Sequence, residues 1–509
     1  MDTREPDPLA EKMFQDADGP VGKQGHAPVR SSRRAFLRRA GTLAATAALG
    51  PTLLATPAAA QRAGNDPPGR RLLARDHGPH IAHAWARRIV QRVKADGYAP
   101  PGSAPHGEQN PDGFDHLTGF TPTSAARLYA YVGIAMYEAV RGGMPAHRSL
   151  AGQLNGMPTL PGAHPSTRYD WPTALSAAVA DTARVLFNRE LSRQDMAAFH
   201  AEQVQARRDA GVPPAVITDS VDHGRAVAAG LQPWIHADGF DEIRQKATEH
   251  GYIQPEGDGL WRPTPPHFGP ALEPYWRHIR PFFLAGPDEV IPAPPVPFSD
   301  DPGSAFYAEA LHTYEAGGSA LTDEHRHIAR FWSDDPRRSG LPPGHWMLTV
   351  GQVAVQRALP LDVTVEAMAR TGVAMADAFL SCWHCKYTLN VVRPVTYIND
   401  YVDKFWGPLL NTPPFPEYTS GHSVSSVAAA VVLTDLLGSL SYTDTYDLAA
   451  GLTEAQRTRH FDSFLHAAQE AAQSRIYGGI HFPMGVDEGK VQGRRVGELA
   501  VARLRTRGR

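Results

Sequence analysis

The sequence predicts an all-α protein whose helices pack in bundles, as two four-helix-bundle-like units with long proline-rich connecting loops. Apolar residues recur every three or four positions along many segments, which is typical of helices with one buried face. Strict alternation of apolar and polar residues is scarce, and we find no convincing strand–helix–strand unit. Many of the 45 prolines cluster between the helical segments. These observations favour helical bundles over a fold built on a sheet.

The composition is that of an ordinary globular protein. The chain has 509 residues, of which 42% are hydrophobic and 20% are charged. This length fits two or three domains or one large helical body. The formal net charge is only −3, so no excess of charge points to nucleic acid, and we expect no nucleic-acid partner.

Residues 1–60 carry the features of an export signal and are expected to lie outside the fold. Residues 32–37 read Ser-Arg-Arg-Ala-Phe-Leu, an apolar stretch follows over 40–55, and three alanines at 58–60 suit a signal peptidase. We therefore predict a twin-arginine signal and a periplasmic or secreted protein. An uncleaved membrane anchor is the alternative. We expect no stable membrane span in the mature chain, because no later stretch is apolar enough.

Residues 61–302 are predicted to form an N-terminal helical region. After a basic linker, apolar residues recur at helical spacing, and residues 125–140 are apolar nearly all round, as in a buried helix. The helices expected in this region lie near residues 81–93, 125–140, 173–190, 192–210 and 214–230. Residues 251–302 hold many prolines and little periodicity, so we predict an extended connector there.

Residues 303–509 are predicted to form a C-terminal helical bundle that carries the functional site. Helix signals are denser here than in the rest of the chain. The expected helices lie near residues 304–316, 323–332, 351–358, 363–386, 423–437, 454–477 and 491–505. Three short segments of this region contain residues that suit the binding of an anion.

The first segment carries two cations, Lys386 and Arg393, seven residues apart. In one continuous helix this spacing places both on the same face, and Pro394 would end that helix. Two cations on one buried face need an anion between them. Taken alone, this segment is better explained by a solvent-exposed basic face.

The second segment, residues 413–422, ends in Ser420-Gly421-His422 and opens an apolar helix. Such a loop presents free backbone N–H groups and the positive end of the helix dipole to an anion. Ser420 can donate its hydroxyl, Gly421 permits close approach of the backbone, and His422 can exchange protons with a bound group. An ordinary helix cap with a surface histidine is the alternative for this segment alone.

The third segment, residues 474–481, adds a third cation, Arg475, and a second histidine, His481. Two glycines between them allow the chain to bend. A neutral imidazole acts as a nucleophile or as a metal ligand. This segment alone carries little information, but the order of the three segments is far more specific than any one of them.

Together the segments read Lys-x6-Arg-Pro, Ser-Gly-His and Ser-Arg-x5-His. This order resembles the signature of the superfamily of vanadium haloperoxidases and phosphatidic-acid-phosphatase-type (PAP2) enzymes. Further segments are similar to bacterial vanadium-dependent haloperoxidases, namely residues 129–141, 261–266, 331–336 and 342–346. The resemblance covers most of the chain beyond residue 60, and it implies that residues 303–509 form a PAP2-like bundle.

The resemblance implies vanadate as the cofactor. The residues that would hold its oxygens are Lys386, Arg393, Ser420, Gly421 and Arg475. His481 would bond the vanadium, and His422 would act as acid and base near the opposite oxygen. One cationic cradle suits phosphate as well as vanadate, because both are tetrahedral oxyanions.

Three more residues receive roles from the same resemblance. Trp383 and Phe415 match positions that line the halide side of the pocket. Asp335 matches a carboxylate that orients an arginine, and capping a helix or binding water is its alternative.

The implied reaction is the oxidation of a halide by hydrogen peroxide to hypohalous acid. His422 would take the peroxide proton and Lys386 would polarise the bound peroxide, so Lys386, His422 and His481 are the expected catalytic residues. Bromide or iodide is favoured, because iodide-oxidising relatives share loops like residues 416–422; chloride stays open, since chloride-oxidising relatives carry phenylalanine at the position of Phe415. An organic acceptor and a homo-oligomer also stay open.

The alternative function is hydrolysis of phosphate monoesters by a PAP2-type acid phosphatase. The same residues would serve, with His481 as the nucleophile that forms a phosphohistidine and His422 as the general acid. The phosphatase pattern usually has an aspartate four residues after this histidine, to orient it. Gly485 stands there in this chain, which favours the haloperoxidase.

Overall fold

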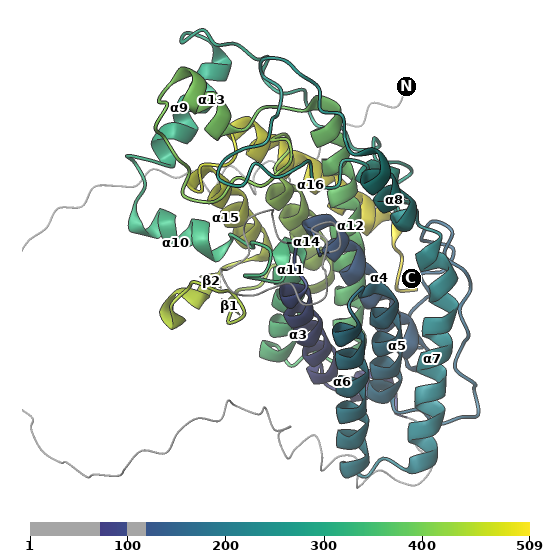
Figure 1. Cartoon of the computed structure of the whole chain (residues 1–509). Helices are drawn as coiled ribbons and strands as arrows, with labels where there is room; N and C mark the ends of the chain where they lie inside the picture. The colour runs from purple at the N-terminus through teal and green to yellow at the C-terminus, as the bar shows by residue number, and fades with distance from the viewer. Residues whose placement is uncertain (1–71, 99–118, 509) are drawn as a thin grey trace, which may run out of the picture. The chain divides into compact units, whose positions relative to one another are not determined.

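The computed structural model describes residues 72–98 and 119–508. This part of the chain is mostly helical, which confirms the predicted fold class, and its one sheet has two short strands (Figure 1). The predicted twin-arginine signal lies outside the described residues.

The helices before residue 302 lie close to the ranges that the periodicity predicts. They are a 3-10 helix Ala74–Asp76, α3 (His80–Ala95), α4 (Pro122–Val140), a 3-10 helix Arg141–Gly143, α5 (Trp171–Leu186), α6 (Glu190–Asp209), α7 (Pro214–His236), α8 (Phe240–His250) and a 3-10 helix Trp276–His278. Helix α4 begins after Thr121, whose hydroxyl accepts a hydrogen bond from the N–H of Ser124. Helix α8 was not predicted, because its sequence is largely polar.

The elements after residue 302 include two strands as well as helices. They are α9 (Ala305–Ala316), α10 (Asp323–Phe331), α11 (Leu341–Gln356), α12 (Leu361–Leu389), α13 (Pro394–Tyr401), α14 (Gly421–Leu437), β1 (Tyr442–Thr445), a 3-10 helix Glu454–Arg457, β2 (Thr458–Phe461), α15 (Phe464–Tyr477) and α16 (Pro483–Arg503). Helix α11 begins ten residues earlier than predicted, because the prolines at 342 and 343 lie in its first turn, where no N–H is needed.

Helix α12 is nearly all buried along its 29 residues and packs on both α4 and α14. At its crossing with α4, a Cβ on Gly133 would stand 2.8 Å from the carbonyl oxygen of Met368, and one on Gly372 would stand 2.9 Å from that of Tyr129. The two backbones therefore touch where glycine alone fits. Helices α4 and α12 belong to the two different regions predicted on either side of residue 302, yet they pack closely together. The domain boundary at residue 302 stays a prediction.

Helix α14 lies among α12, α15 and α16 in the C-terminal bundle (Figure 1). Its apolar side chains are mostly buried, so its N-terminus is held by packing on several neighbours. The ends of these helices position the site described below.

The sequence prediction for Lys386 and Arg393 is corrected by the structure. Helix α12 ends at Leu389, because Asn390 adopts the left-handed conformation (φ 50°), and Arg393 lies beyond it as the residue that caps α13. Pro394 is the first residue of α13 and does not end a helix. The two cations therefore do not share a helix face, and a turn of the chain brings them together.

The single helix predicted over residues 454–477 is also wrong. Only Phe464–Tyr477 is α-helical, and Ser463 caps it by accepting from the N–H of His466. Before it, β2 pairs antiparallel with β1, with Tyr442 opposite Phe461 and Asp444 opposite Arg459. The pairing of β1 with β2 overrides the helical preference of this segment, which contains few residues of clear strand character.

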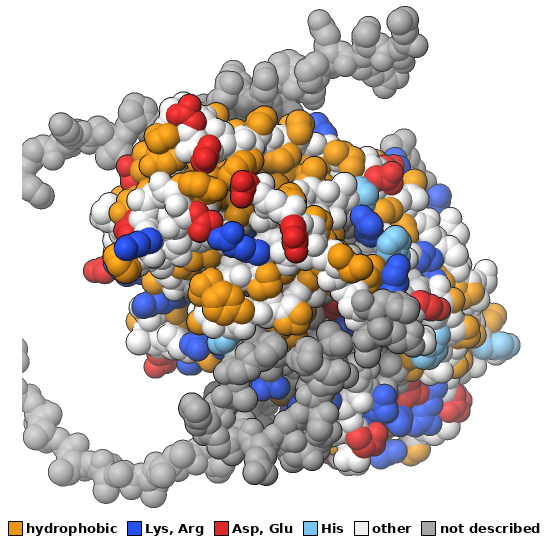
Figure 2. Space-filling view, turned by 45° about the horizontal axis from the view of Figure 1, so that its top comes forward, with side chains coloured by type: hydrophobic (Ala, Val, Ile, Leu, Met, Phe, Trp, Pro, Cys, Tyr) orange, Lys and Arg blue, Asp and Glu red, His pale blue; other side chains and the backbone are white. Residues whose placement is uncertain are grey.

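The surface carries charges of both signs. On the face shown in Figure 2, acidic and basic side chains are interspersed among hydrophobic ones. This mixture agrees with the formal net charge of −3. Within residues 72–98 and 119–508, no helix combines the length and the apolar character that a membrane span requires.

Candidate functional site

Five helix ends converge on the residues that the three sequence segments predict. Lys386 lies in the last turn of α12, and Arg393 caps α13. Ser420 caps α14, Arg475 lies in the last turn of α15, and His481 precedes α16. Pro394 and Pro483 occupy first-turn positions of their helices, which fixes where α13 and α16 begin.

Three cations of the site are buried without a carboxylate partner. Lys386 and Arg393 are fully buried and Arg475 is 2% exposed. Within the described part of the chain, no carboxylate forms an ion pair with any of the three; backbone carbonyls accept their hydrogen bonds instead. Buried cations without a counter-ion are costly, so this arrangement suits a bound anion.

Lys386 donates to two carbonyl oxygens of the loop that precedes α14. Its Nζ lies 2.8 Å from the oxygen of Pro416 and 2.9 Å from that of Glu417. Burial lowers the pKa of Lys386 to about 7. An anion beside Nζ would favour the charged form and raise this pKa.

The two arginines have donors to spare. Arg393 donates from Nε to the oxygen of Phe415 (2.8 Å) and from Nη1 to that of Ile480 (2.8 Å), while its Nη2 is buried without a partner among the described residues. Arg475 donates from Nη1 to the oxygen of Trp332 (2.6 Å), and its Nε is likewise buried without one. Burial lowers the pKa of each guanidinium to about 10. The free N–H groups fit the oxygens of a tetrahedral oxyanion.

His481 is held by a carboxylate that the sequence analysis missed. Its Nδ1 lies 2.6 Å from Oε1 of Glu417, which also accepts from the N–H of Phe482. With Nδ1 donating, the lone pair lies on Nε2, which is 3.2 Å from Nη1 of Arg393 on the side of the cations. Burial and the neighbouring cations hold the pKa of His481 well below its ordinary value, so the ring is neutral.

Gly485 explains how Glu417 reaches this position. A Cβ at residue 485 would stand 2.2 Å from Oε1 of Glu417, so any side chain there would displace the carboxylate. The carboxylate that the phosphatase pattern places four residues after this histidine is supplied here by the loop before α14. Burial raises the pKa of Glu417 to about 7.

His422 contacts two groups of opposite charge through the same ring nitrogen. Its Nε2 lies 3.3 Å from Nη1 of Arg475 and 3.7 Å from Oδ2 of Asp334. Burial and Arg475 lower the pKa of His422 to about 4. Within residues 72–98 and 119–508, no group hydrogen bonds with its Nδ1, which leaves that nitrogen free for a bound molecule.

Ser420 and Gly421 form the N-terminus of α14. The Ser420 hydroxyl accepts from the N–H of Ser423 (3.3 Å), so its own proton is free to be donated. A Cβ on Gly421 would meet the rings of Phe379 at 3.3 Å and Trp383 at 3.5 Å, so the backbone lies close against these aromatic rings.

Trp383 and Phe415 form an aromatic wall beside the cations. Their ring centroids are 4.8 Å apart. Nζ of Lys386 lies 5.0 Å from the centroid of Phe415, and Cζ of Arg393 lies 4.9 Å from it. The structure thus brings these two predicted residues to the site.

Asp335 lies near Arg475 but forms no ion pair with it among the described residues. Burial raises the pKa of Asp335 to about 6, and the nearby Arg475 opposes that rise. Its predicted orienting role stays a prediction. The preceding residue, Asp334, makes the direct contact with His422, and the sequence analysis gave it no role.

Among the described residues, no group of three or more His, Cys, Asp and Glu side chains could hold a metal ion. The donors gathered here are N–H groups, hydroxyls and one imidazole nitrogen. They suit an oxyanion that carries its own oxygens and takes a single protein ligand.

Comparisons with known proteins identify similar chains. The family model described as the VCPO second helical-bundle domain matches residues 366–507. The vanadium chloroperoxidase of Curvularia inaequalis is 24% identical over 42% of this chain, and the match spans 47% of that enzyme. This chain therefore aligns with about half the length of the curated relative.

Solved structures extend the similarity to most of the chain. A bacterial vanadium-dependent iodoperoxidase is 33% identical, with a TM-score of 0.73, over 85% of this chain and 98% of the other. A bacterial vanadium-dependent chloroperoxidase in its holo form is 17% identical, with a TM-score of 0.55, over 78% of this chain and 94% of the other, and shows likeness of fold.

Proposed function

Because the chain belongs to the vanadium-dependent haloperoxidase family, we propose that it holds vanadate at the converging helix ends and oxidises a halide with hydrogen peroxide. The observation that carries the proposal is the cluster of buried cations that lack a carboxylate partner, next to a neutral, oriented His481.

The residues present fit a vanadate ion. Nη2 of Arg393 and Nε of Arg475 are buried donors without a partner among the described residues, and an oxyanion would satisfy both. Lys386, the Ser420 hydroxyl and the N–H of Gly421 would contact the remaining oxygens. Nε2 of His481 would form the one bond between the protein and vanadium.

Glu417 prepares His481 for this role. By accepting the Nδ1 proton it leaves the lone pair on Nε2 and fixes the plane of the ring. The chemistry that vanadate supplies when bound is Lewis-acid activation of hydrogen peroxide toward attack by a halide.

His422 and Lys386 would move and stabilise charge during the reaction. The lowered pKa leaves the ring of His422 neutral at ordinary pH, and with the ring proton on Nε2 the free Nδ1 would accept a proton from hydrogen peroxide. Lys386, when charged, would stabilise negative charge on the activated oxygen, and the surrounding burial strengthens that interaction.

We propose iodide or bromide as the preferred halide. The similarity to a bacterial iodoperoxidase, at 33% identity over most of both chains, supports iodide in particular. The aromatic wall of Trp383 and Phe415 offers polarisable, apolar surface next to the cations, which suits a large and weakly hydrated anion. An organic acceptor would react with the product, and the twin-arginine motif supports action outside the cytoplasm.

Gly485 was the sequence argument against a phosphatase, and the position of Glu417 removes its force. Glu417 orients His481 as the missing aspartate at position 485 would, so Gly485 does not separate the two activities. Family membership favours the haloperoxidase. Hydrolysis of phosphate esters is the alternative outcome of the assay described next.

A paired assay on the purified chain loaded with orthovanadate tests the proposal. One arm measures peroxide-dependent oxidation of iodide, bromide and chloride, and the other measures aryl-phosphate hydrolysis without vanadate. We expect vanadate-dependent oxidation, fastest with iodide or bromide, and its loss in the His481→Ala variant. Phosphate release without halide oxidation, or full oxidation by the His481→Ala variant, would overturn it.

A further inference from the structure

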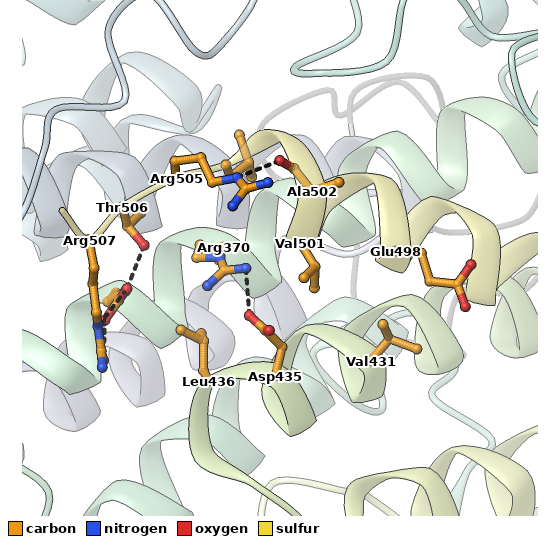
Figure 3. Close-up of a pocket in the computed structure, with 12 residues that line it drawn as sticks. Arg370, Val431, Asp435, Leu436, Glu498, Val501, Ala502, Arg505, Thr506 and Arg507 are labelled. Carbon is orange, nitrogen blue, oxygen red and sulfur yellow. Dashed lines mark hydrogen bonds and ion pairs between the residues drawn. The ribbon is translucent and has the colours of Figure 1, made fainter. Parts of the chain in front are cut away.

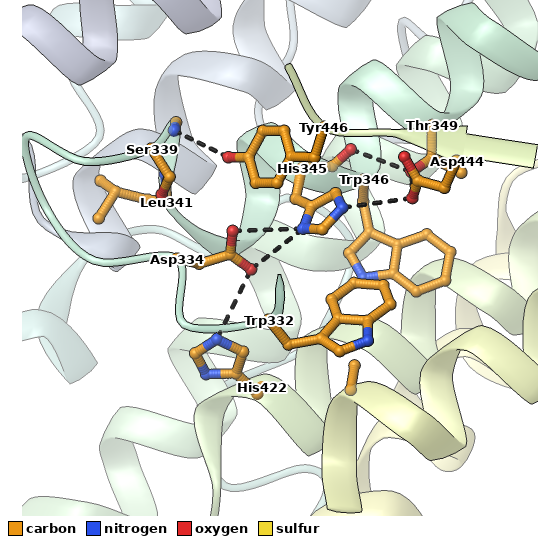
Figure 4. Close-up of polar contacts among 12 residues, drawn as sticks. Trp332, Asp334, Ser339, Leu341, His345, Trp346, Thr349, His422, Asp444 and Tyr446 are labelled. Atoms are coloured by element: carbon orange, nitrogen blue, oxygen red, sulfur yellow. Dashed lines mark hydrogen bonds and ion pairs between the residues drawn. The ribbon is translucent and has the colours of Figure 1, made fainter. Parts of the chain in front are cut away.

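A third histidine, His345, is buried behind His422 and belongs to neither the predicted site nor the mechanism above. His345, on α11, is fully buried and lies between two carboxylates (Figure 4). Its Nδ1 is 3.2 Å from Oδ1 and 3.3 Å from Oδ2 of Asp334, and its Nε2 is 3.2 Å from Oδ2 of Asp444, on β1. The second contact is an ion pair without the alignment of a hydrogen bond.

Aromatic rings hold the His345 imidazole on both faces. The ring centroid of Tyr446 lies 3.9 Å away at an interplanar angle of 28°, and that of Trp332 lies 4.4 Å away at 27°. Stacking against these rings favours a cationic imidazole. Although burial opposes the charge, the two carboxylates raise the pKa of His345 to about 9, so the ring carries a proton at neutral pH.

Asp334 joins this buried group to the site. The carboxylate that contacts His345 also lies 3.7 Å from Nε2 of His422, and His345 and His422 together hold the pKa of Asp334 well below its ordinary value (Figure 4). On its other side, Asp444 accepts from the hydroxyl of Thr349 (3.0 Å) and faces Nε2 of Gln352 (3.3 Å). One chain of contacts therefore runs from His422 through Asp334 and His345 to Asp444.

Two groups compete for Nε2 of His422. Nη1 of Arg475 lies within hydrogen-bond distance at 3.3 Å and would place the ring proton on Nδ1. Oδ2 of Asp334 lies 3.7 Å away as an ion-pair contact, and it would place the proton on Nε2 if it accepted from this nitrogen. Only the second arrangement leaves the free Nδ1 able to accept a proton from a bound molecule. An ionised Asp334 is therefore necessary for His422 to act as a base.

We propose that His345 is a positioning residue for His422: as a cation held between Asp334 and Asp444, it keeps Asp334 ionised and aimed at Nε2 of His422, so that Nδ1 faces the site without a proton. Without that cation, the buried Asp334 would take up a proton or turn to Arg475. His422 would then carry its proton on Nδ1. The expected loss of halide oxidation rests on the proposed function, whereas the expected position of the His422 ring proton does not.

The experiment compares His345→Gln with the parent chain, with His223→Gln as the matched control. His223 is another buried histidine, whose Nε2 contacts the carbonyl oxygen of Ala139 on α4, away from the site. The first readout is the ¹⁵N chemical shift of His422 in histidine-labelled protein, assigned with His422→Gln. The second is the affinity for inorganic phosphate, and the third is halide oxidation after loading with vanadate.

We expect the proton of His422 on Nε2 in the parent and in His223→Gln, and a shift toward Nδ1 in His345→Gln. Phosphate affinity should stay within about twofold, because Lys386, Arg393 and Arg475 are untouched, and oxidation should fall roughly 10- to 100-fold. An unchanged His422 signal, or a loss of phosphate affinity as large as the loss of oxidation, would overturn the proposal.

A second variant keeps the test decisive if His345→Gln does not fold. Asp444→Asn retains the shape of the side chain and removes one of the two charges that hold His345, so it should move the His422 signal in the same direction by a smaller amount. No movement in a folded Asp444→Asn variant would count against the proposal. Absence of halide oxidation in the parent would defeat the proposed function alone, since the ¹⁵N signal is measured without it.

Discussion

Two clusters of arginines in this chain differ in how their charges are balanced. A groove of about 460 Å³ lies near the C-terminus, among α12, α14, α16 and residues 504–507 (Figure 3). There Arg370 pairs with Asp435 at 2.9 Å and Arg507 pairs with Glu366 at 2.6 Å. At the converging helix ends, by contrast, Lys386, Arg393 and Arg475 have no ion pair among the described residues.

The difference teaches that charge balance indicates an anion site better than volume does. The groove is large, but carboxylates already pair with two of the three arginines that line it, and the third, Arg505, is exposed to solvent. The helix-end site is tightly built, but it buries donors that carbonyl oxygens only partly satisfy. An anion would gain much in the second place and little in the first.

Replacement of Arg393 should have the largest effect on the affinity of the helix-end site for an anion. In Arg393→Met, the affinity for inorganic phosphate should fall roughly 30-fold or more, because loss of a buried charge partner costs about 2–5 kcal/mol. Isothermal titration calorimetry measures it, with thermal unfolding as the control for folding. Affinity within threefold of the parent in a folded variant would mean that the anion does not contact this guanidinium.

Glu417→Gln should have the next largest effect, roughly 10- to 100-fold on vanadate affinity, because the carboxylate fixes the ring of His481. Gly485→Asp alone should also weaken binding, since its side chain would collide with Glu417. The double variant Glu417→Ala with Gly485→Asp should recover part of the affinity by supplying the carboxylate from α16. If the double variant binds more weakly than both single variants, the two positions do not substitute for each other.

The pH dependence of binding sharpens the comparison further. Burial lowers the pKa of Lys386 to about 7, so in the empty site this cation loses its proton as the pH rises through about 7. Glu417, with a pKa raised to about 7, gains negative charge over the same range. Sulfate affinity, measured because the charge of sulfate is constant here, should fall above pH 7 by at most about tenfold per pH unit for each group. In Lys386→Met the remaining pH dependence of sulfate affinity should be that of Glu417 alone. A pH dependence equal to that of the parent would mean that Lys386 does not contact the anion.

Arg370→Met in the groove should have the smallest effect. The pair with the partly exposed Asp435 contributes about 0–1 kcal/mol to stability, and neither residue lies at the helix-end site. Phosphate affinity and halide oxidation should stay within about twofold of the parent. A large loss of binding here would mean that the groove is coupled to the site.

Most of the helices could be predicted from the sequence for local physical reasons, and the residues of the candidate site from the order of three motifs. Apolar periodicity shows where α3 to α7 and α12 lie, and caps and prolines show where several of them begin. The order of three short motifs was enough to select Lys386, Arg393, Ser420, His422, Arg475 and His481, and the structure brings all of them together.

The residues that the sequence analysis missed act across long separations. Glu417 is 64 residues from His481, and its role depends on the space left by Gly485. The contact of Asp334 with His422, and that of His345 with Asp444, likewise join separate elements. Periodicity and spacing report on neighbours within one element, so no pattern could show which carboxylate would meet which ring. The pairing of β1 with β2 was missed for the same reason.

The convergence of five helix ends has a consequence for the folding of the protein. An anion at this point would contact residues from 386 to 481 on separate helices, and would act as a non-covalent cross-link among them. Because it binds the folded chain and not the unfolded one, a concentration of 100 times its Kd would add about 2.7 kcal/mol to the free energy of unfolding. Amide protons at the start of α14 and the end of α12 should then exchange more slowly with solvent deuterium, so occupancy of the site can be followed without any turnover.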